Sequence, residues 1–285
     1  MTTGRELHLL LPIGGTQPLR LLDVIPPLDV PPGPERWLQG VTWEPWQYRG
    51  LTIDNEETCV LSTFDVVPTT CEAWLSQAPF RLSDAIEGAN LTYALEEAQG
   101  TLTARYNMTI SAAFASELLS GAGSADRSLS SEATAPVRAA FGSAATPVWD
   151  ALAILESEIA GRLFGGVGLI HIPPGLLAQA ILTYGIGRGP SGAWETPAGN
   201  IVISDAGYVD PPAPTGQAAS TATQDWIYCS GPIWFGSSVP HFIGADSETM
   251  SLSTNTYTTF VAGYGILVFD TDPVSAVLAS YDVNA

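Results

Sequence analysis

Residues 90–119 read NLTYALEEAQGTLTARYNMTISAAFASELL, and they carry the strongest structural signal in the chain. Asn90 is a suitable N-cap at the start of this stretch. A helix over these residues would span about 40 Å at 1.5 Å per residue, although Gly100 weakens it. The apolar residues recur at steps of three and four, which lays one stripe along such a helix: Leu91, Leu95, Ala98, Leu102, Tyr106, Ile110, Ala113, Phe114 and Leu118. We predict a long helix that acts as a beam across an elongated subunit.

Proline marks the segment before this helix. Such a density of proline disfavours helices and favours extended backbone. Leucine, valine and tryptophan lie between the prolines, so this segment should lie on another surface as an arm. The aromatic group Trp37, Trp43, Trp46 and Tyr48 suits core or interface packing, with a sugar-binding platform as the alternative. The prolines concerned are Pro12, Pro18, Pro26, Pro27, Pro31, Pro32, Pro34 and Pro45.

The sequence after the long helix predicts a loop followed by both helices and strands. Residues 120–146 are rich in glycine, serine and alanine, which is typical of a loop. Thr146 followed by Pro147 resembles the start of a helix, and Trp149, Leu152, Leu155, Ile159 and Leu163 continue an apolar stripe. A short strand at 168–172, a breaker at 173–175 and a short helix at 176–184 follow, and the expected strands are 200–204, 225–229, 232–235 and 257–269, with an apolar segment at 274–278. This order indicates an α+β architecture.

Charge is scarce and unbalanced. All ten basic residues are arginine, there is no lysine, and the formal net charge is −19. Schiff-base chemistry and the P-loop clamp both need a lysine amine and are therefore excluded. The arginines do not cluster, so we expect no nucleic-acid-binding face. Only 14% of residues are charged, which favours a surface covered by partner subunits.

The cysteines and the apolar segments exclude other classes. Cys59, Cys71 and Cys229 have no metal-ligand spacing, and their odd number leaves at least one thiol unpaired, with a Cys59–Cys71 bridge as the alternative to reduced thiols. The apolar run 8–11 is too short for a signal peptide. Residues 163–187 carry no charge, but prolines and glycines interrupt them, so a buried strand and helix are expected and no membrane contact is predicted.

Candidate catalytic and ligand-binding motifs are weak. The string GRGPSG at 187–192 follows a helix and opens none, which argues against a dinucleotide site. His171 lies in an apolar strand and should be a hydrogen-bonded core residue, and His241 should lie in a loop near Asp246 and Glu248. The acid pairs Glu156 with Glu158 and Asp270 with Asp272 are the glycosidase candidates, but a spacing of two turns the helical pair to different faces. We assign no catalytic, cofactor-binding or metal-binding residue and expect no enzyme.

The order of elements over residues 90–285 resembles that of the tailed-bacteriophage major capsid proteins of the Hong Kong 97 type, a fold shared with encapsulins. The resemblance rests on a long helix, a helix at 147–163, and the segments IHIPP at 170–174, TPAGNIVIS at 196–204, DWIY at 225–228 and YGILVFD at 264–270. It implies an N-terminal arm at 1–40, an extended loop region at 41–90, peripheral-domain helices including the spine helix at 91–164, an axial domain at 165–252, and returning strands of the peripheral domain at 253–285.

The resemblance also implies a function. It implies self-assembly into pentamers and hexamers of an icosahedral head in the virion, assembled in the host cytoplasm. DNA would be enclosed without sequence-specific contact, and scaffold, portal and decoration proteins would be the other partners. Family members that lock the shell through lysine–asparagine isopeptide bonds use a residue that this chain lacks. The alternatives are an accessory virion protein, such as a decoration or tail component, and an acidic carbohydrate-active enzyme with two converging carboxylates.

Overall fold

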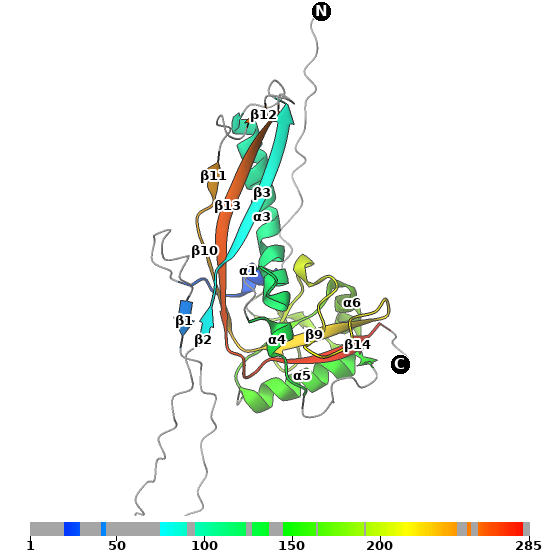
Figure 1. Cartoon of the computed structure of the whole chain (residues 1–285). Helices are drawn as coiled ribbons and strands as arrows, with labels where there is room; N and C mark the ends of the chain where they lie inside the picture. Colours follow the sequence, from blue (N-terminus) through cyan, green and yellow to red (C-terminus); the bar gives the residue numbers. More distant parts are fainter. Residues whose placement is uncertain are drawn as a thin grey trace, which may run out of the picture.

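The computed structural model describes residues 20–28, 41–43, 75–89, 95–123, 127–136, 145–163, 165–190, 192–243, 250–251 and 256–281. They form a long part, in which a helix lies along a narrow sheet, and a compact part at one end of it (Figure 1). The mixture of helices and two larger sheets confirms the α+β class. Several predicted features lie outside the described residues: the Asn90 cap, Cys59, Cys71, Trp37, Trp46, Tyr48, Asp246 and Glu248.

The predicted long helix is present as α3, Leu95–Ser120, with 26 residues. Its buried side chains include Leu102, Tyr106, Phe114 and Leu118, which belong to the predicted stripe. Residues one step around the helix, such as Arg105, are exposed. The four-residue spacing therefore places one apolar face of α3 against the sheet beside it.

The sheet of the long part is built around β13, Thr256–Phe269. On one edge β13 pairs antiparallel with β3, Phe80–Ala89, from Thr256 opposite Ala89 to Gly265 opposite Phe80. On the other edge lie three shorter strands, β10 (Ile233–Ser237), β11 (His241–Ile243) and β12 (Met250–Ser251). A separate antiparallel pair joins β1 (Val41–Trp43) to β2 (Leu75–Gln77).

Glycines in β13 let the helix approach this sheet closely. A Cβ added at Gly265 would lie 2.5 Å from the Phe80 ring and 2.7 Å from the Phe114 ring, which pack edge to face with each other. A Cβ at Gly263 would lie 2.5 Å from the Tyr106 hydroxyl. The aromatic side chains therefore occupy the space that side chains at 263 and 265 would need.

The compact part contains a seven-stranded sheet with two covered faces. Ile170, Val202 and Ile227 point to one face and pack with the helices α5 (Val148–Arg162) and α6 (Pro174–Tyr184). Leu169 and Trp226 point to the other face and join the core of α3 and the 3-10 helix η1 (Ala206–Tyr208). The strand order is β4 (Thr146–Pro147), β14 (Ser275–Ser280), β9 (Gln224–Ser230), β5 (Leu169–His171), β8 (Ile201–Ile203), β7 (Trp194–Glu195) and β6 (Gly187–Arg188).

Two consecutive strand pairs connect the parts. The strand β9 leads through Gly231 and Pro232 into β10, and β13 leads through residues 270–274 into β14. Because β10 pairs with β13 and β9 pairs with β14, the chain crosses between the sheets twice at one place. Strand β14 thus belongs to the seven-stranded sheet, and α5 packs against that sheet.

Three local predictions need correction. Thr146 and Pro147 do not form a capped helix start: they form β4, Pro147 occupies the cap position without a side-chain bond, and α5 begins at Val148. Trp149 leaves the predicted stripe and is 47% exposed, because the buried face of α5 runs through Val148 and Leu152. Two short helices, α1 (Leu21–Val24) and α4 (Leu129–Glu132), occur where extended backbone and a loop were expected.

Candidate functional site

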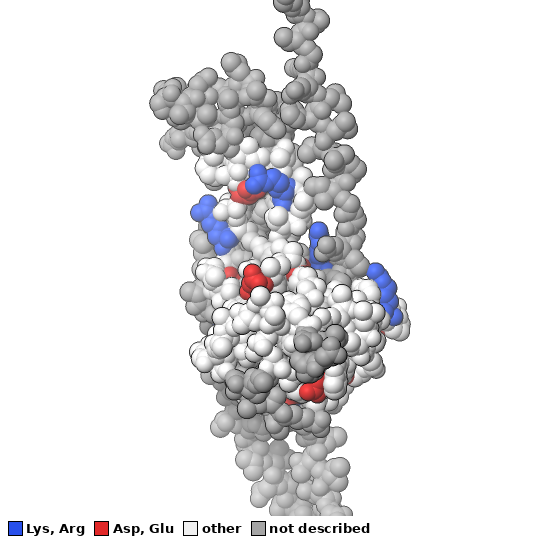
Figure 2. Space-filling view, turned by 90° about the vertical axis from the view of Figure 1, so that its right-hand side faces the viewer, with Lys and Arg blue, Asp and Glu red and all other residues white. Residues whose placement is uncertain are grey.

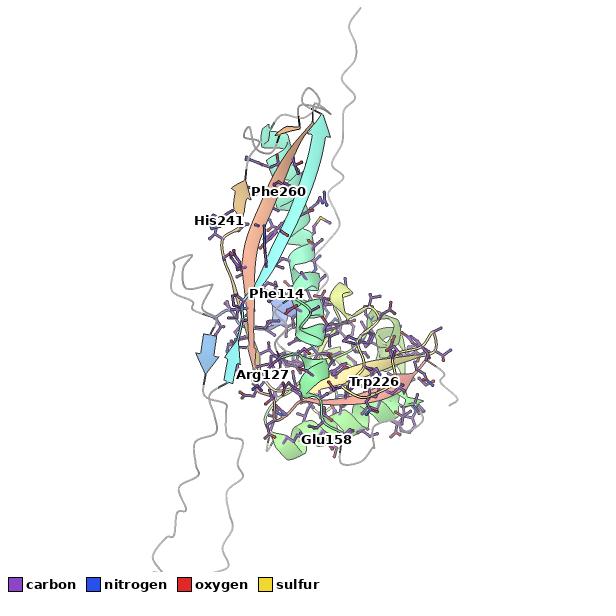
Figure 3. All side chains as sticks on the ribbon, in the orientation of Figure 1. Phe114, Arg127, Glu158, Trp226, His241 and Phe260 are labelled. Atoms are coloured by element: carbon purple, nitrogen blue, oxygen red, sulfur yellow. The ribbon has the colours of Figure 1, made fainter. Side chains whose placement is uncertain are left out.

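The residues considered for catalysis do not converge. Figure 3 shows His241 on the long part and Glu158 on α5 in the compact part, well separated from each other. His241 lies in strand β11, not in a loop, and is exposed. Within the described ranges, no group of three or more histidine, cysteine, aspartate or glutamate residues is placed to hold a metal ion.

His171 is a hydrogen-bonded core residue, as predicted. Its Nδ1 lies 2.7 Å from the Tyr208 hydroxyl and its Nε2 lies 2.9 Å from the Ser230 hydroxyl. Ser230 donates its own proton to the Gly231 carbonyl, so Nε2 carries the imidazole proton and Nδ1 accepts from Tyr208. Burial lowers the pKa of His171 to about 3, which keeps the ring neutral at physiological pH.

Asp205 lies at the junction of α1, α3 and η1. One carboxylate oxygen, Oδ2, accepts from the backbone N–H of Leu21 at 2.9 Å and from the Ser111 hydroxyl at 2.6 Å. The other oxygen, Oδ1, caps η1 by accepting from the Gly207 N–H at 3.2 Å. Burial, and secondarily the Asp205 charge, raises the pKa of Tyr208 well above its ordinary value. These contacts organise the fold and leave no reactive group exposed.

The acid pair on α5 diverges, as its spacing predicted. Glu156 accepts from the Tyr184 hydroxyl at 2.5 Å, whereas Glu158 is buried and pairs with Arg162 at 3.2 Å. Arg162 also donates to the backbone carbonyl of Asp272 at 2.6 Å. A glycosidase needs two carboxylates facing one cleft, and Glu156 and Glu158 do not meet this requirement.

Cys229 and the glycine-rich string are also structural. Burial raises the pKa of the Cys229 thiol to about 12, and the S–H group points to the Pro273 carbonyl at 3.7 Å. Such a thiol is not a nucleophile at neutral pH. Strand β6 pairs antiparallel with β7, and none of the described residues between them is helical, so none presents helix amides to a phosphate. The string therefore begins in a strand, and Gly187 and Arg188 pair with Glu195 and Trp194.

The arginines of the described residues divide into two sets. Three pair with carboxylates: Arg105 with Asp84, Arg127 with Glu132 and Arg162 with Glu158. The other three have no carboxylate partner within the described residues: Arg20, Arg81 and Arg188. Half of the arginines in the described residues therefore pair with a carboxylate of this chain.

The surface is largely uncharged and exposes apolar side chains. In the view of Figure 2, the described part of the face is mostly uncharged and carries only a few basic and acidic residues. Among the described residues, the most exposed large apolar side chains are Leu182, Val239 and Val209, at 84%, 77% and 63%. Within the described part of the chain, no helix combines the length and hydropathy needed to cross a bilayer. Interfaces combine such apolar positions with arginine, so the candidate site is an association surface.

The chain is similar to solved capsid structures. No protein-family model matches the sequence, and no curated protein matches it. Among solved structures, the chain is similar to the capsid of an empty GTA particle, over 98% of this chain and 95% of that chain, with a TM-score of 0.56 and 11% identity. A structure from Microbacterium phage Oxtober96 matches over 99% and 96%, with a TM-score of 0.53 and 9% identity. The capsid of a native GTA particle matches over 94% and 99%, with a TM-score of 0.51 and 14% identity.

Proposed function

We propose that this chain, which has the Hong Kong 97-type capsid fold, is a structural capsid protein that assembles with copies of itself into the shell of a phage-like particle. The observation that carries the proposal is the likeness to a GTA capsid over nearly the whole of both chains. The exposed apolar residues and the scarcity of surface charge support it, because a surface of this kind is covered in an assembly.

The subunits would form pentamers and hexamers of an icosahedral shell. The arm at 1–40 and the loop region at 41–90 would extend over neighbouring copies, and α3 would be the spine of the peripheral domain. The axial domain would comprise residues 165–252, and residues 253–285 would be the returning strands of the peripheral domain. Many modest contacts would then add through effective concentration once a ring closes.

The partners would follow from that role. DNA would be enclosed rather than bound, since a chain with net charge −19 repels phosphate. Scaffold, portal and decoration proteins are the remaining proposed partners, the host cytoplasm is the proposed place of assembly, and the role is structural rather than enzymatic.

Negative-stain electron microscopy of the purified chain tests this function. Closed shells, or capsomers with fivefold and sixfold symmetry, are the expected result. A monodisperse monomer at every salt and protein concentration tried would contradict the proposal.

A further inference from the structure

Helix α6 and the hairpin after it expose an apolar side chain close in sequence to an arginine. The helix reads PGLLAQAILTY and contains no charged residue. Leu182, in its last turn, is 84% exposed. After the left-handed Gly185, the chain enters β6, where Arg188 is exposed. We call Leu182 and Arg188 the hairpin patch.

Arg188 is held in place and forms no ion pair among the described residues. Its guanidinium lies 5.6 Å from the centre of the Trp194 ring, and Nη1 donates to the Gly192 carbonyl at 3.1 Å. Gly192 has a φ of +82°, which suits glycine at this turn. A guanidinium has five N–H donors, and this contact uses one. Arg188 therefore presents a preorganised positive charge at the outermost strand of the seven-stranded sheet.

A second exposed corner carries the opposite charge. Val209 is 63% exposed, and Asp210 after it is also exposed. Asp210 has a φ of 51°, the only positive value for a non-glycine residue among those the structure describes. The next residues are anchored, since the Pro211 carbonyl accepts from the Ser220 hydroxyl at 3.2 Å. Strained backbone that neighbouring contacts hold in place tends to mark functional positions. We call Val209 and Asp210 the acidic corner.

The two surfaces are too far apart to pair within one chain. The carbonyl of Pro212, two residues after Asp210, accepts a hydrogen bond from the hydroxyl of Tyr228 on β9, so the acidic corner lies near that strand. Strands β9 and β6 are four places apart in the sheet. At about 4.8 Å per place this is about 19 Å, well beyond the reach of an ion pair.

We propose that the hairpin patch of one copy binds the acidic corner of the next copy, with Arg188 paired to Asp210 and Leu182 packed against Val209. The inference rests on the proposed function and names the residues of one contact in that assembly. Each surface joins an exposed apolar residue to a charge of opposite sign, so the two are complementary. Because they differ and lie apart on the molecule, the contact is head-to-tail, which is the kind that closes rings.

Charge exchange between the two residues tests the pairing. Arg188→Glu and Asp210→Arg each create a like-charge contact, and each is expected to raise the critical concentration for assembly about tenfold or more. The double variant R188E/D210R restores the attraction in reversed order and keeps the wild-type net charge. It should assemble within about threefold of the wild-type concentration. Light scattering and negative-stain microscopy measure all four proteins, and circular dichroism confirms that each is folded.

The outcomes separate this inference from the function on which it rests. If the wild-type chain never assembles, the proposed function fails. If the wild type assembles and both single variants assemble equally well, or if the double variant is no better than the singles, the pairing is refuted. Arg188→Gln and Leu182→Ser provide a second measurement without charge reversal, and both should weaken assembly. Full assembly of both variants would equally overturn the proposal.

Discussion

The Asp205 carboxylate accepts a hydrogen bond from the backbone N–H of Leu21, a residue 184 positions earlier in the chain, at 2.9 Å. The same oxygen accepts from Ser111 on α3 at 2.6 Å. One buried side chain thus joins α1, the long helix and the end of the compact part. Substitution of Asp205 therefore tests whether the packing of α1 against α3 contributes to the free energy of unfolding.

Replacing Asp205 by alanine should destabilise the protein by about 3 kcal/mol, because buried donors on Leu21 and Ser111 lose a charged acceptor. Asp205→Asn should be intermediate, since its amide keeps one oxygen acceptor and the volume. Urea denaturation measures the change. Asp23→Ala, an exposed carboxylate on α1, is the matched control and should leave the midpoint unchanged. Equal stability of D205A and wild type would contradict this role.

His171 should make the protein sensitive to acid. Its pKa is lowered from 6.5 to about 3 by burial, so below pH 6.5 the unfolded chain binds a proton that the folded chain does not. The free energy of unfolding is therefore unaffected by the titration of His171 above pH 6.5. As the pH falls from 6.5 toward 3, protonation of this histidine in the unfolded chain lowers the free energy of unfolding by about 1.4 kcal/mol per pH unit. Carboxylates add their own pH dependence, so the comparison is with His171→Gln, which cannot titrate. The urea midpoint should fall less between pH 7 and pH 5 in the variant than in the wild type. An equal fall in both proteins would show that His171 does not cause the acid sensitivity.

Two glycines offer a matched pair with opposite expected effects. A Cβ at Gly207 would lie 2.1 Å from the Ala112 carbonyl oxygen of α3, so Gly207→Ala should cost several kcal/mol by forcing η1 away from the helix. At Gly100, within α3, nothing lies within 4 Å of an added Cβ. Gly100→Ala should stabilise the protein by about 0.5–1 kcal/mol, because alanine is the better helix former. Thermal melts of both variants, compared with the wild type, measure these effects. An unchanged melting temperature of G207A would show that η1 does not pack against α3 as described.

Shells of this protein should separate fully in hot detergent. The chain contains no lysine, so it cannot form lysine–asparagine isopeptide links. Boiled particles should run as a single band at the monomer mass on a denaturing gel. Ladders of higher mass that persist with reductant would contradict a non-covalent shell. Ladders that disappear with reductant would instead indicate bridges between cysteines.

The sequence alone predicted elements whose pattern is local. The four-residue spacing from Leu102 to Leu118 identified α3, and the apolar runs identified β5, β9 and β13. The hydrogen-bonded core position of His171 followed from an imidazole in an apolar strand. The divergence of Glu156 and Glu158 followed from their spacing on a helix. Each of these features depends on the spacing of residues within one helix or strand and not on the elements that pack against it.

Only the tertiary structure decided the features that depend on partners distant in sequence. Strand β3 was expected only as part of an extended loop region; Phe80, Leu82 and Ile86 alternate with exposed residues, and ten residues of pairing with β13 set its length. Thr146 and Pro147 resemble a helix cap, but pairing with the end of β14 makes them a strand. Which arginines lack an acid, and that Arg188 and Asp210 stand on separate corners, depends on how the chain folds back on itself. Spacing along the chain determined the elements, whereas contacts between residues far apart in sequence determined the surfaces through which copies would meet.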